Sequence, residues 1–345
     1  MFLLRGRSRL IGIVITVALL ALLAWKIDFR EFGVALANAN YAWALPAILT
    51  TTTSYLLRTV RWGRIVRPIR RISFSKLLPV LFIGFMANNL LPARMGEVVR
   101  AYALNRKTGL SKTLGLATIL LERLCDGLTL VLALGVVALI FPLPPGVREV
   151  GIVAGLVFIG ASVASVIVLA RENLAVKLVN LLVQRLPRKI HARVDGKAES
   201  FLVGLGAMRH GSDLLAVAAW SLVIWSVELT TYLLVLQSVQ PHLATGTPLM
   251  AAVLLMVAVN LGTLIPSTPG YIGAYQFFGV LALSAFGIST GEALAVSIVA
   301  HVAQWTTVTA FGLFFAARES IGLKSLAGTE RGTNTRLLAA SPAKD

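Results

Sequence analysis

Cysteine and histidine are scarce in this chain. Its single cysteine, Cys125, lies in an apolar run and has no second cysteine with which it could form an internal disulfide. The four histidines are scattered, and the sequence contains no CxxC pair and no cluster of histidine and cysteine. Because such clusters are the usual pattern of a metal site, we expect neither a bound metal nor another cofactor.

Charged residues are also few. They make up 14% of the 345 residues, against about 25% in an average soluble domain. Hydrophobic residues make up 57%, and the mean hydropathy is +0.81, which predicts an integral membrane protein. The net charge of +17 comes from basic residues that flank apolar runs. This placement favours contact with anionic membrane lipids and not with nucleic acid.

Motifs of soluble catalysis are absent as well. The sequence has no nucleotide-binding loop, no DxD motif and no histidine-based acid–base set. These absences argue against an enzyme. A membrane-embedded transferase that acts on a lipid-linked donor stays an alternative.

Apolar runs organise the chain as an all-α integral membrane protein. We expect about six full transmembrane helices, at residues 10–25, 41–57, 113–141, 150–170, 214–239 and 293–317. Together they form one transmembrane domain over residues 1–317, with a first half of about 1–170 and a second half of 214–317. We expect a basic amphipathic linker at 171–213 and a basic, disordered tail at 318–345, both in the cytoplasm.

The basic residues set the expected orientation. Of the 32 lysines and arginines, we place Lys26, Arg30 and Arg148 outside and Arg123 within the membrane, which leaves 28 on the cytoplasmic side. A dense basic run at 58–76 follows the second span. By the positive-inside rule, we expect a multi-pass protein of the plasma (inner) membrane with both termini in the cytoplasm.

Two further apolar segments are interrupted by residues that do not suit a membrane helix. The first contains Asn88, Asn89, Pro92 and Gly96. Proline lacks a backbone N–H, and glycine permits backbone conformations closed to other residues. Interrupted backbone at membrane depth needs shelter from lipid, so we expect a re-entrant hairpin that enters from the cytoplasm and lines a cavity. The alternative is a short helix that ends at an ordinary loop.

The second interruption, IPSTPGYIGAYQFF, suggests an internal repeat. At a shift of 174 residues Pro92 maps onto Pro266 and Gly96 onto Gly270, so each half contains a helix, a broken hairpin and a helix. The charge pattern predicts that the second hairpin enters from outside. This order is typical of inverted repeats in secondary transporters, whose substrate site lies between paired broken segments. Chance recurrence of proline and glycine is the alternative.

Three ionisable residues of the third span stand close together. Glu122 and Asp126 share one helix face, and Arg123 can pair with Asp126. A charge at the centre of a membrane helix costs about 2.5–3.5 kcal/mol, so we expect a mutually satisfied triad that serves either substrate binding or helix packing alone. Glu228 is a further candidate and has no charged neighbour within its own span.

Arginines beside the first interruption suggest phosphate binding. We expect Arg94 and Arg100 at the cytoplasmic mouth, where the planar fork of a guanidinium suits a phosphate. Glu97 precedes Arg100 by three residues and can orient it. The alternative is that these are ordinary positive-inside charges, which we favour for Arg106 and Lys107.

Three motifs, NNLLPARMGEVVRAYAL, LERLCDG and IPSTPGYIGAYQ, occur in this order. With them the chain resembles the lysylphosphatidylglycerol synthase transmembrane-region family, also called the flippase-like or UPF0104 family, over about residues 10–317. The family's motif positions fall on the following residues: Asn89, Pro92, Arg94, Gly96, Glu97, Arg100, Glu122, Arg123, Asp126, Pro266, Pro269, Gly270 and Gly273.

This resemblance implies a role in lipid movement. Similar membrane domains in multiple-peptide-resistance proteins move aminoacylated phospholipid between leaflets, and some stand-alone members sit near glycosyltransferases. In the full synthases a soluble C-terminal domain transfers the amino acid; the sequence after residue 317 is too short for it, so we expect no synthase activity. The first hypothesis is a translocase for a phospholipid or polyprenyl-linked lipid. The alternatives are the embedded transferase and a membrane partner of a separate glycosyl- or aminoacyl-transferase, with the oligomeric state left open.

Overall fold

The structure is a computed structural model that describes residues 2–91, 94–143, 145–170, 211–240, 242–243, 247–265 and 268–319. Four of the predicted features fall wholly or mostly outside these residues. They are Pro92, Pro266, the linker at 171–213 and the tail at 318–345.

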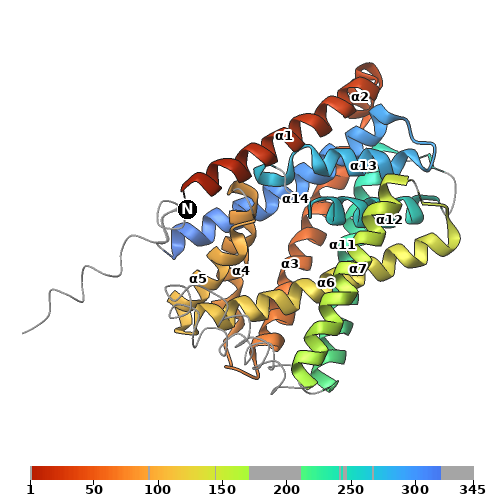
Figure 1. The fold of residues 1–345 in the computed structure, drawn as a ribbon. Helices are drawn as coiled ribbons and strands as arrows, with labels where there is room; N and C mark the ends of the chain where they lie inside the picture. Colours follow the sequence, from red (N-terminus) through yellow and green to blue (C-terminus); the bar gives the residue numbers. More distant parts are fainter. Residues whose placement is uncertain are drawn as a thin grey trace, which may run out of the picture.

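The described chain is helical and contains no strand (Figure 1). The helices are α1 (Phe2–Lys26), α2 (Phe29–Asn38), α3 (Ala44–Val66), α4 (Phe74–Leu90), α5 (Gly96–Thr108), α6 (Lys112–Ile140), α7 (Pro145–Ala170), α11 (Gly211–Val239), α12 (Thr247–Gly262), α13 (Ala274–Ser284) and α14 (Thr290–Arg318). Two 3-10 turns, η1 (Tyr41–Trp43) and η2 (Pro269–Tyr271), complete the set.

Several of these helices can cross a membrane. Within the described residues, α6, residues 145–164 of α7, residues 213–239 of α11 and α14 are long and apolar enough to do so. The pair α1 and α2 adds a fifth span if the two count as one, although they meet at a bend of 90° (Figure 1). The all-α membrane class is therefore confirmed. The count of six spans stays a prediction, since α3 carries Arg58, Arg61 and Arg64 along its 23 residues.

The last membrane helix begins earlier than its apolar pattern indicates. Ser289 and Glu292 form a capping box in which the Ser289 hydroxyl accepts from the Glu292 N–H and the Glu292 carboxylate accepts from the Ser289 N–H. These bonds satisfy donors that a helix start leaves free. Glu292 therefore caps α14, and the helix runs from Thr290 for 29 residues.

Each interruption joins two short helices that pack against each other, α4 with α5 and α12 with α13. In the first hairpin, Gly96 has no left-handed backbone. A Cβ at Gly96 would lie 2.1 Å from the carbonyl oxygen of Gly84, and one at Gly84 would lie 2.8 Å from Cβ of Arg100. The expectation that Gly96 supplies special backbone freedom is thus wrong. Glycine is needed there because α4 and α5 come too close for a side chain.

The second hairpin does use glycine for its backbone. Gly270 has a φ of 72° and Gly273 a φ of 88°, a left-handed region that other residues enter only at a cost. The chain reverses around η2 through these two positions. The two hairpins therefore break by different means.

Equivalent parts of the predicted repeat lie against each other. Helices α3 and α11 pack together, and Ser54 Oγ donates to Glu228 Oε2 at 2.5 Å across a separation of 174 residues, which is the shift of the repeat. The two breaks also meet, because a Cβ at Gly270 would lie 3.3 Å from the carbonyl oxygen of Asn89. The opposite membrane orientation of the two halves stays a prediction.

Candidate functional site

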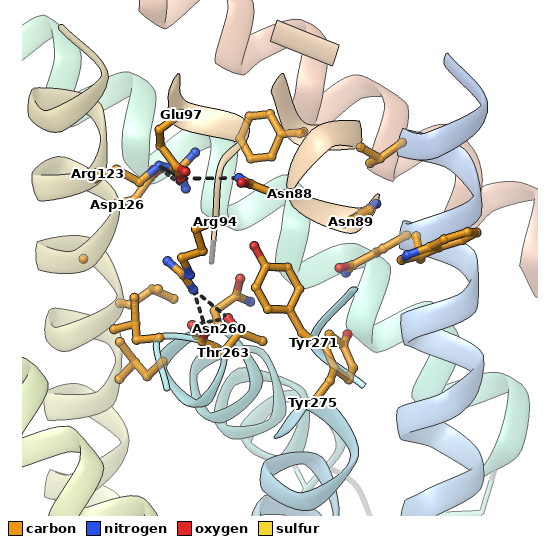
Figure 2. A pocket seen from close by; sticks show the side chains of 18 of the residues that line it. Asn88, Asn89, Arg94, Glu97, Arg123, Asp126, Asn260, Thr263, Tyr271 and Tyr275 are labelled. Atoms are coloured by element: carbon orange, nitrogen blue, oxygen red, sulfur yellow. Dashed lines mark hydrogen bonds and ion pairs between the residues drawn. The ribbon is translucent and has the colours of Figure 1, made fainter. Parts of the chain in front are cut away.

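A cavity of about 150 Å³ lies between the two hairpins (Figure 2). Both breaks contribute to its wall, together with the middle parts of α3, α6, α11 and α14. Its polar lining residues are Asn88, Asn89, Arg94, Glu97, Arg123, Asp126, Asn260, Thr263, His301 and Gln304. Aromatic side chains of Tyr55, Phe85, Phe158, Trp225, Tyr271, Tyr275 and Trp305 complete it. Six of the residues singled out from the sequence, Asn88, Asn89, Arg94, Glu97, Arg123 and Asp126, line this one cavity.

Arg94 reaches across this cavity from the first break to the second hairpin (Figure 2). Its φ of 50° is unusual for a residue with a side chain. The Nη2 atom donates to the carbonyl oxygen of Thr263 at 2.6 Å, and the guanidinium lies 5.4 Å from the ring centroid of Tyr271. Tyr271 is itself left-handed, with a φ of 61°. Strained backbone of this kind is characteristic of functional sites, and here one strained residue from each break contacts the other.

The first break is fixed by the side chains of two asparagines. Asn88 Oδ1 accepts from the N–H of Gly96 at 2.7 Å, and Asn88 Nδ2 donates to Glu97 Oε1 at 3.3 Å. Asn89 Nδ2 donates to Thr309 Oγ1 at 3.0 Å. Asn88 therefore supplies an acceptor that the start of α5 lacks, and Asn89 ties the hairpin to α14.

The second break is fixed through a histidine. The N–H of Gly273 donates to Gln276 Oε1 at 2.8 Å, and Gln276 Nε2 is 2.9 Å from His301 Nδ1. The His301 ring stacks on Tyr275 with centroids 4.3 Å apart. His301 is thus a polar contact between α13 and α14 at the cavity wall. Pro269 is the first residue of η2.

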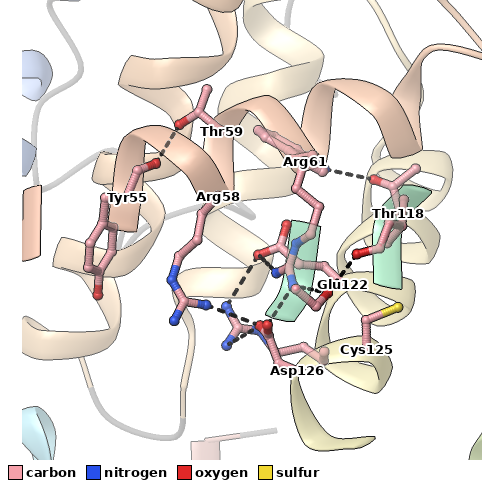
Figure 3. Close-up of polar contacts among 12 residues, drawn as sticks. Tyr55, Arg58, Thr59, Arg61, Thr118, Glu122, Cys125 and Asp126 are labelled. Atoms are coloured by element: carbon pink, nitrogen blue, oxygen red, sulfur yellow. Dashed lines mark hydrogen bonds and ion pairs between the residues drawn. The ribbon is translucent and has the colours of Figure 1, made fainter. Parts of the chain in front are cut away.

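A buried ion network surrounds Glu122 and Asp126 (Figure 3). It adjoins the cavity, because Asp126 and Arg123 also line that cavity. Arg100 donates to both oxygens of Glu122, at 3.0 and 2.8 Å. Asp126 accepts from Arg61 at 2.7 Å and from Arg58 at 3.3 Å. These five side chains come from α3, α5 and α6, so their ion pairs hold three helices together.

The predicted triad of Glu122, Arg123 and Asp126 is wrong as a self-contained group. Arg123 lies 3.7 Å from Glu122 and 3.9 Å from Asp126, longer than the bonds from Arg61 and Arg100. Its side chain is 30% exposed, whereas that of Glu122 is fully buried. Adjacent residues of a helix point about 100° apart, so Arg123 does not face Glu122 directly. The nearest partners of Glu122 and Asp126 come from α5 and α3.

Arg100 does not stand at a cytoplasmic mouth. It is 2% exposed, is held by Glu122, and lies 3.7 Å from the ring centroid of Trp62. Glu97 does not orient it, since Glu97 contacts Asn88 and, at 4.0 Å, Arg123. A role for Arg100 in holding a phosphate at a mouth is therefore excluded by its burial.

Arg58 and Arg61 were expected among the cytoplasmic charges, yet they are 5% and 0% exposed. Helix α3 continues past residue 57 and buries Trp62 and Ile65 as well. The signal for this was present in the sequence, because apolar residues persist at helical spacing through the basic run. Glu228 is not isolated either: besides Ser54, it has Arg58 Nη2 at 3.7 Å.

The network is balanced in charge. It contains four arginines, at 58, 61, 100 and 123, and four carboxylates, at 97, 122, 126 and 228. Buried charges are tolerated when they are paired. Arg94 differs, because no carboxylate of the described residues forms an ion pair with it. The cavity therefore contains a guanidinium that forms no ion pair with a carboxylate of the described residues.

The fold and the site together define a class: a helical membrane protein with two broken hairpins around a polar cavity. Within that class, the chain belongs to the family described as the lysylphosphatidylglycerol synthase TM region, which matches it over residues 9–312.

Three related proteins align with most of this chain at 23–27% identity. The glycosyltransferase AglD of Haloferax volcanii is 27% identical over 326 residues, which cover 85% of this chain and 51% of that protein. A UPF0104 membrane protein of Methanothermobacter thermautotrophicus is 24% identical over 87% of this chain and 92% of its own. Another from Pyrococcus horikoshii is 23% identical over 87% and 94%. The chain thus spans about half the length of AglD and nearly all of the other two. The family and these relatives support a membrane function related to lipids.

Proposed function

We propose that this protein is a flippase-like translocase that moves a phospholipid or polyprenyl-linked lipid between membrane leaflets. The headgroup passes through the cavity between the hairpins, and the acyl or prenyl chains stay in the bilayer. The observation that carries this proposal is the guanidinium of Arg94, which forms no ion pair among the described residues and lies in a polar cavity. An anionic phosphate is the group that such a charge attracts.

Arg94 is well placed for a phosphate. Among the described residues its hydrogen bonds come from Nη2 and go to Thr263, so the rest of the fork is available. Guanidinium donors match two phosphate oxygens at once, and the bond is stronger when both partners are charged. Asn89 and Asn260 also line the cavity, and their amide nitrogens bond Thr309 and, for Asn260, Tyr232 and Met256. Their side-chain oxygens can accept hydrogen bonds from a headgroup.

The cavity is small, which fits a closed state. Its 150 Å³ is below the roughly 300–1,000 Å³ of typical ligand pockets. The contact between Arg94 and Thr263 joins the two hairpins across it. Admission of a headgroup therefore requires the hairpins to separate, and a phosphate that replaces the Thr263 carbonyl at Arg94 would favour that separation.

The membrane setting belongs to the same proposal. The positive-inside rule favours the plasma membrane with both termini in the cytoplasm. This chain is similar to about half of a protein named as a glycosyltransferase. That similarity supports the proposal that this protein works beside a separate glycosyl- or aminoacyl-transferase. In that arrangement the partner builds the lipid headgroup and this chain moves it.

Purified protein in liposomes tests the proposal. A labelled anionic lipid is placed in one leaflet, and its movement is followed with a quencher that cannot cross the bilayer. Movement without any added enzyme supports the translocase, and its absence with every lipid tested contradicts it. Turnover of a lipid-linked donor would instead support the embedded transferase. The identity of lipids that copurify with the protein directs the choice of label.

A further inference from the structure

We propose a second anionic-lipid site, separate from the central cavity, in a groove formed by the end of α3 and the start of α4. The groove has a volume of about 440 Å³. We call it the basic groove and define it by Arg64, Arg67, Arg71, Gly63, Phe74 and Leu77, all of which line it. Its occupant is a phospholipid with an anionic headgroup.

Charge is the first argument for this occupant. Arg64, Arg67 and Arg71 are exposed, and none forms an ion pair with a carboxylate in the part of the chain that the structure describes. Three like charges that border one groove repel each other, and a bound anion relieves that repulsion. The neighbouring Arg70 is different, because it donates to the carbonyl oxygen of Thr108.

The start of α4 adds further positive potential. Ser73 precedes this 17-residue helix, and its side chain makes no capping hydrogen bond to the first turn. The N–H groups of a helix start attract anions when they have no intrahelical acceptor. Phe74, the first residue of α4, lines the groove, so this end of the helix lies beside the three arginines.

An apolar part of the groove suits a lipid and not a free anion. Phe74 is 43% exposed, although it is a large aromatic residue. Gly63 and Leu77 are neighbours in the groove, because a Cβ added at Gly63 would lie 3.4 Å from Leu77 Cδ1. Gly63, Phe74 and Leu77 thus give the groove an apolar wall against which an alkyl chain can lie. Basic pockets between membrane helices that combine these features recognise anionic lipid headgroups.

The groove does not depend on the translocase proposal. Its arginines belong neither to the ion network nor to the central cavity. Helix α4 connects the two places, because Phe74 and Leu77 line the groove while Asn88 and Asn89 line the cavity. A lipid bound in the groove thus contacts the start of the first broken hairpin.

Lipid titration of the purified chain in detergent tests this site. Bound lipids are counted by native mass spectrometry with phosphatidylglycerol and, separately, with zwitterionic phosphatidylcholine. The groove variant carries Arg64→Gln, Arg67→Gln and Arg71→Gln. The control carries Arg30→Gln, Arg106→Gln and Arg148→Gln, three exposed arginines outside the groove, so both variants have the same net charge.

We expect the groove variant to lose affinity for phosphatidylglycerol by about 10- to 100-fold, since each basic side chain near an anionic lipid contributes up to about fivefold. The control variant should retain it. Unchanged phosphatidylglycerol affinity in the groove variant, or equal affinity of the natural protein for phosphatidylcholine, would overturn the proposal. If the triple variant does not fold, Arg67→Gln alone should lower the affinity about fivefold, and wild-type affinity there would contradict the site.

Discussion

Arg61 and Arg94 both lie within the helix bundle, and their surroundings differ. Arg61 is fully buried and donates to Asp126 and to Ser221, each at 2.7 Å. Arg94 is half-buried and donates to the carbonyl of Thr263. Both guanidinium groups are charged, but a carboxylate pairs with Arg61 and none of the described carboxylates pairs with Arg94. A paired arginine can fix helices relative to one another, whereas an unpaired one retains the capacity to bind an anion.

We expect the largest effect from a substitution that removes Arg61, the arginine that is paired with carboxylates. Arg61→Ala removes a charge that Asp126 and Glu122 need, and loss of one partner of a buried ion pair costs about 3–5 kcal/mol. We expect a large fall in folded yield and in the thermal unfolding temperature of the purified protein, measured by fluorescence-detected size-exclusion after heating.

A second substitution separates charge imbalance from lost packing. Asp126→Asn in the Arg61→Ala background removes the carboxylate that has lost its shortest ion pair, so part of the stability should return, which a double-mutant cycle measures. Wild-type unfolding temperature for Arg61→Ala alone would show that the network does not stabilise the fold.

Alanine substitutions in the two hairpins should have effects of intermediate size on stability. Gly96→Ala places a Cβ 2.1 Å from a backbone oxygen of α4, and overpacking of this kind costs about 1–3 kcal/mol. Gly270→Ala meets its nearest atom at 3.0 Å and adds left-handed strain of about 1 kcal/mol. We expect Gly96→Ala to lower the unfolding temperature more. Gly135→Ala, where a Cβ meets no atom within 4 Å, is the control, and the reverse order of the two would contradict the close approach of α4 and α5.

The variant Arg94→Lys tests whether the unpaired arginine, Arg94, binds the lipid phosphate. Lysine keeps the charge but loses the planar fork, so lipid movement in liposomes should fall about tenfold, which equals about 1.4 kcal/mol. Stability should change little, because no ion pair is broken. Arg106→Lys, at an exposed position outside the cavity, should behave like the natural protein. Equal transport by Arg94→Lys, Arg106→Lys and wild type would remove phosphate capture by Arg94 from the mechanism.

Much of the fold could be predicted from the composition and from the residues that interrupt the apolar runs. Long apolar runs fix the all-α membrane class, and polar residues with proline and glycine mark both interruptions. The repeat shift also paired the two interruptions, and both line one cavity in the structure. These features are local in the sequence or recur within it, so no tertiary information is needed to find them.

The pairing of charges could not be predicted in the same way. A positive-inside count treats Arg58, Arg61 and Arg100 as surface charges, because it does not register which helix face each occupies. Their partners, Glu122 and Asp126, lie at separations of 22 to 68 residues. The role of Gly96 likewise depends on Gly84 across the hairpin. Such contacts are set by how the helices pack, which spacing along one helix does not encode.

We expect the smallest effect on stability from substitution of Arg123, which contacts the ion network and also lines the cavity. Arg123 contacts Glu97, Glu122 and Asp126 only at 3.7–4.0 Å, and its side chain is 30% exposed. Partly exposed pairs contribute about 0–1 kcal/mol, and the two buried carboxylates keep Arg61 and Arg100 as nearer partners. Arg123→Ala should therefore lower the unfolding temperature much less than Arg61→Ala does. Both variants are measured in the same detergent and at the same salt concentration, since a partly exposed pair weakens as salt rises. Equal losses for the two substitutions would mean that Arg123 is a full member of the network, and that distance and exposure do not separate the charges that hold this fold from those that face the cavity.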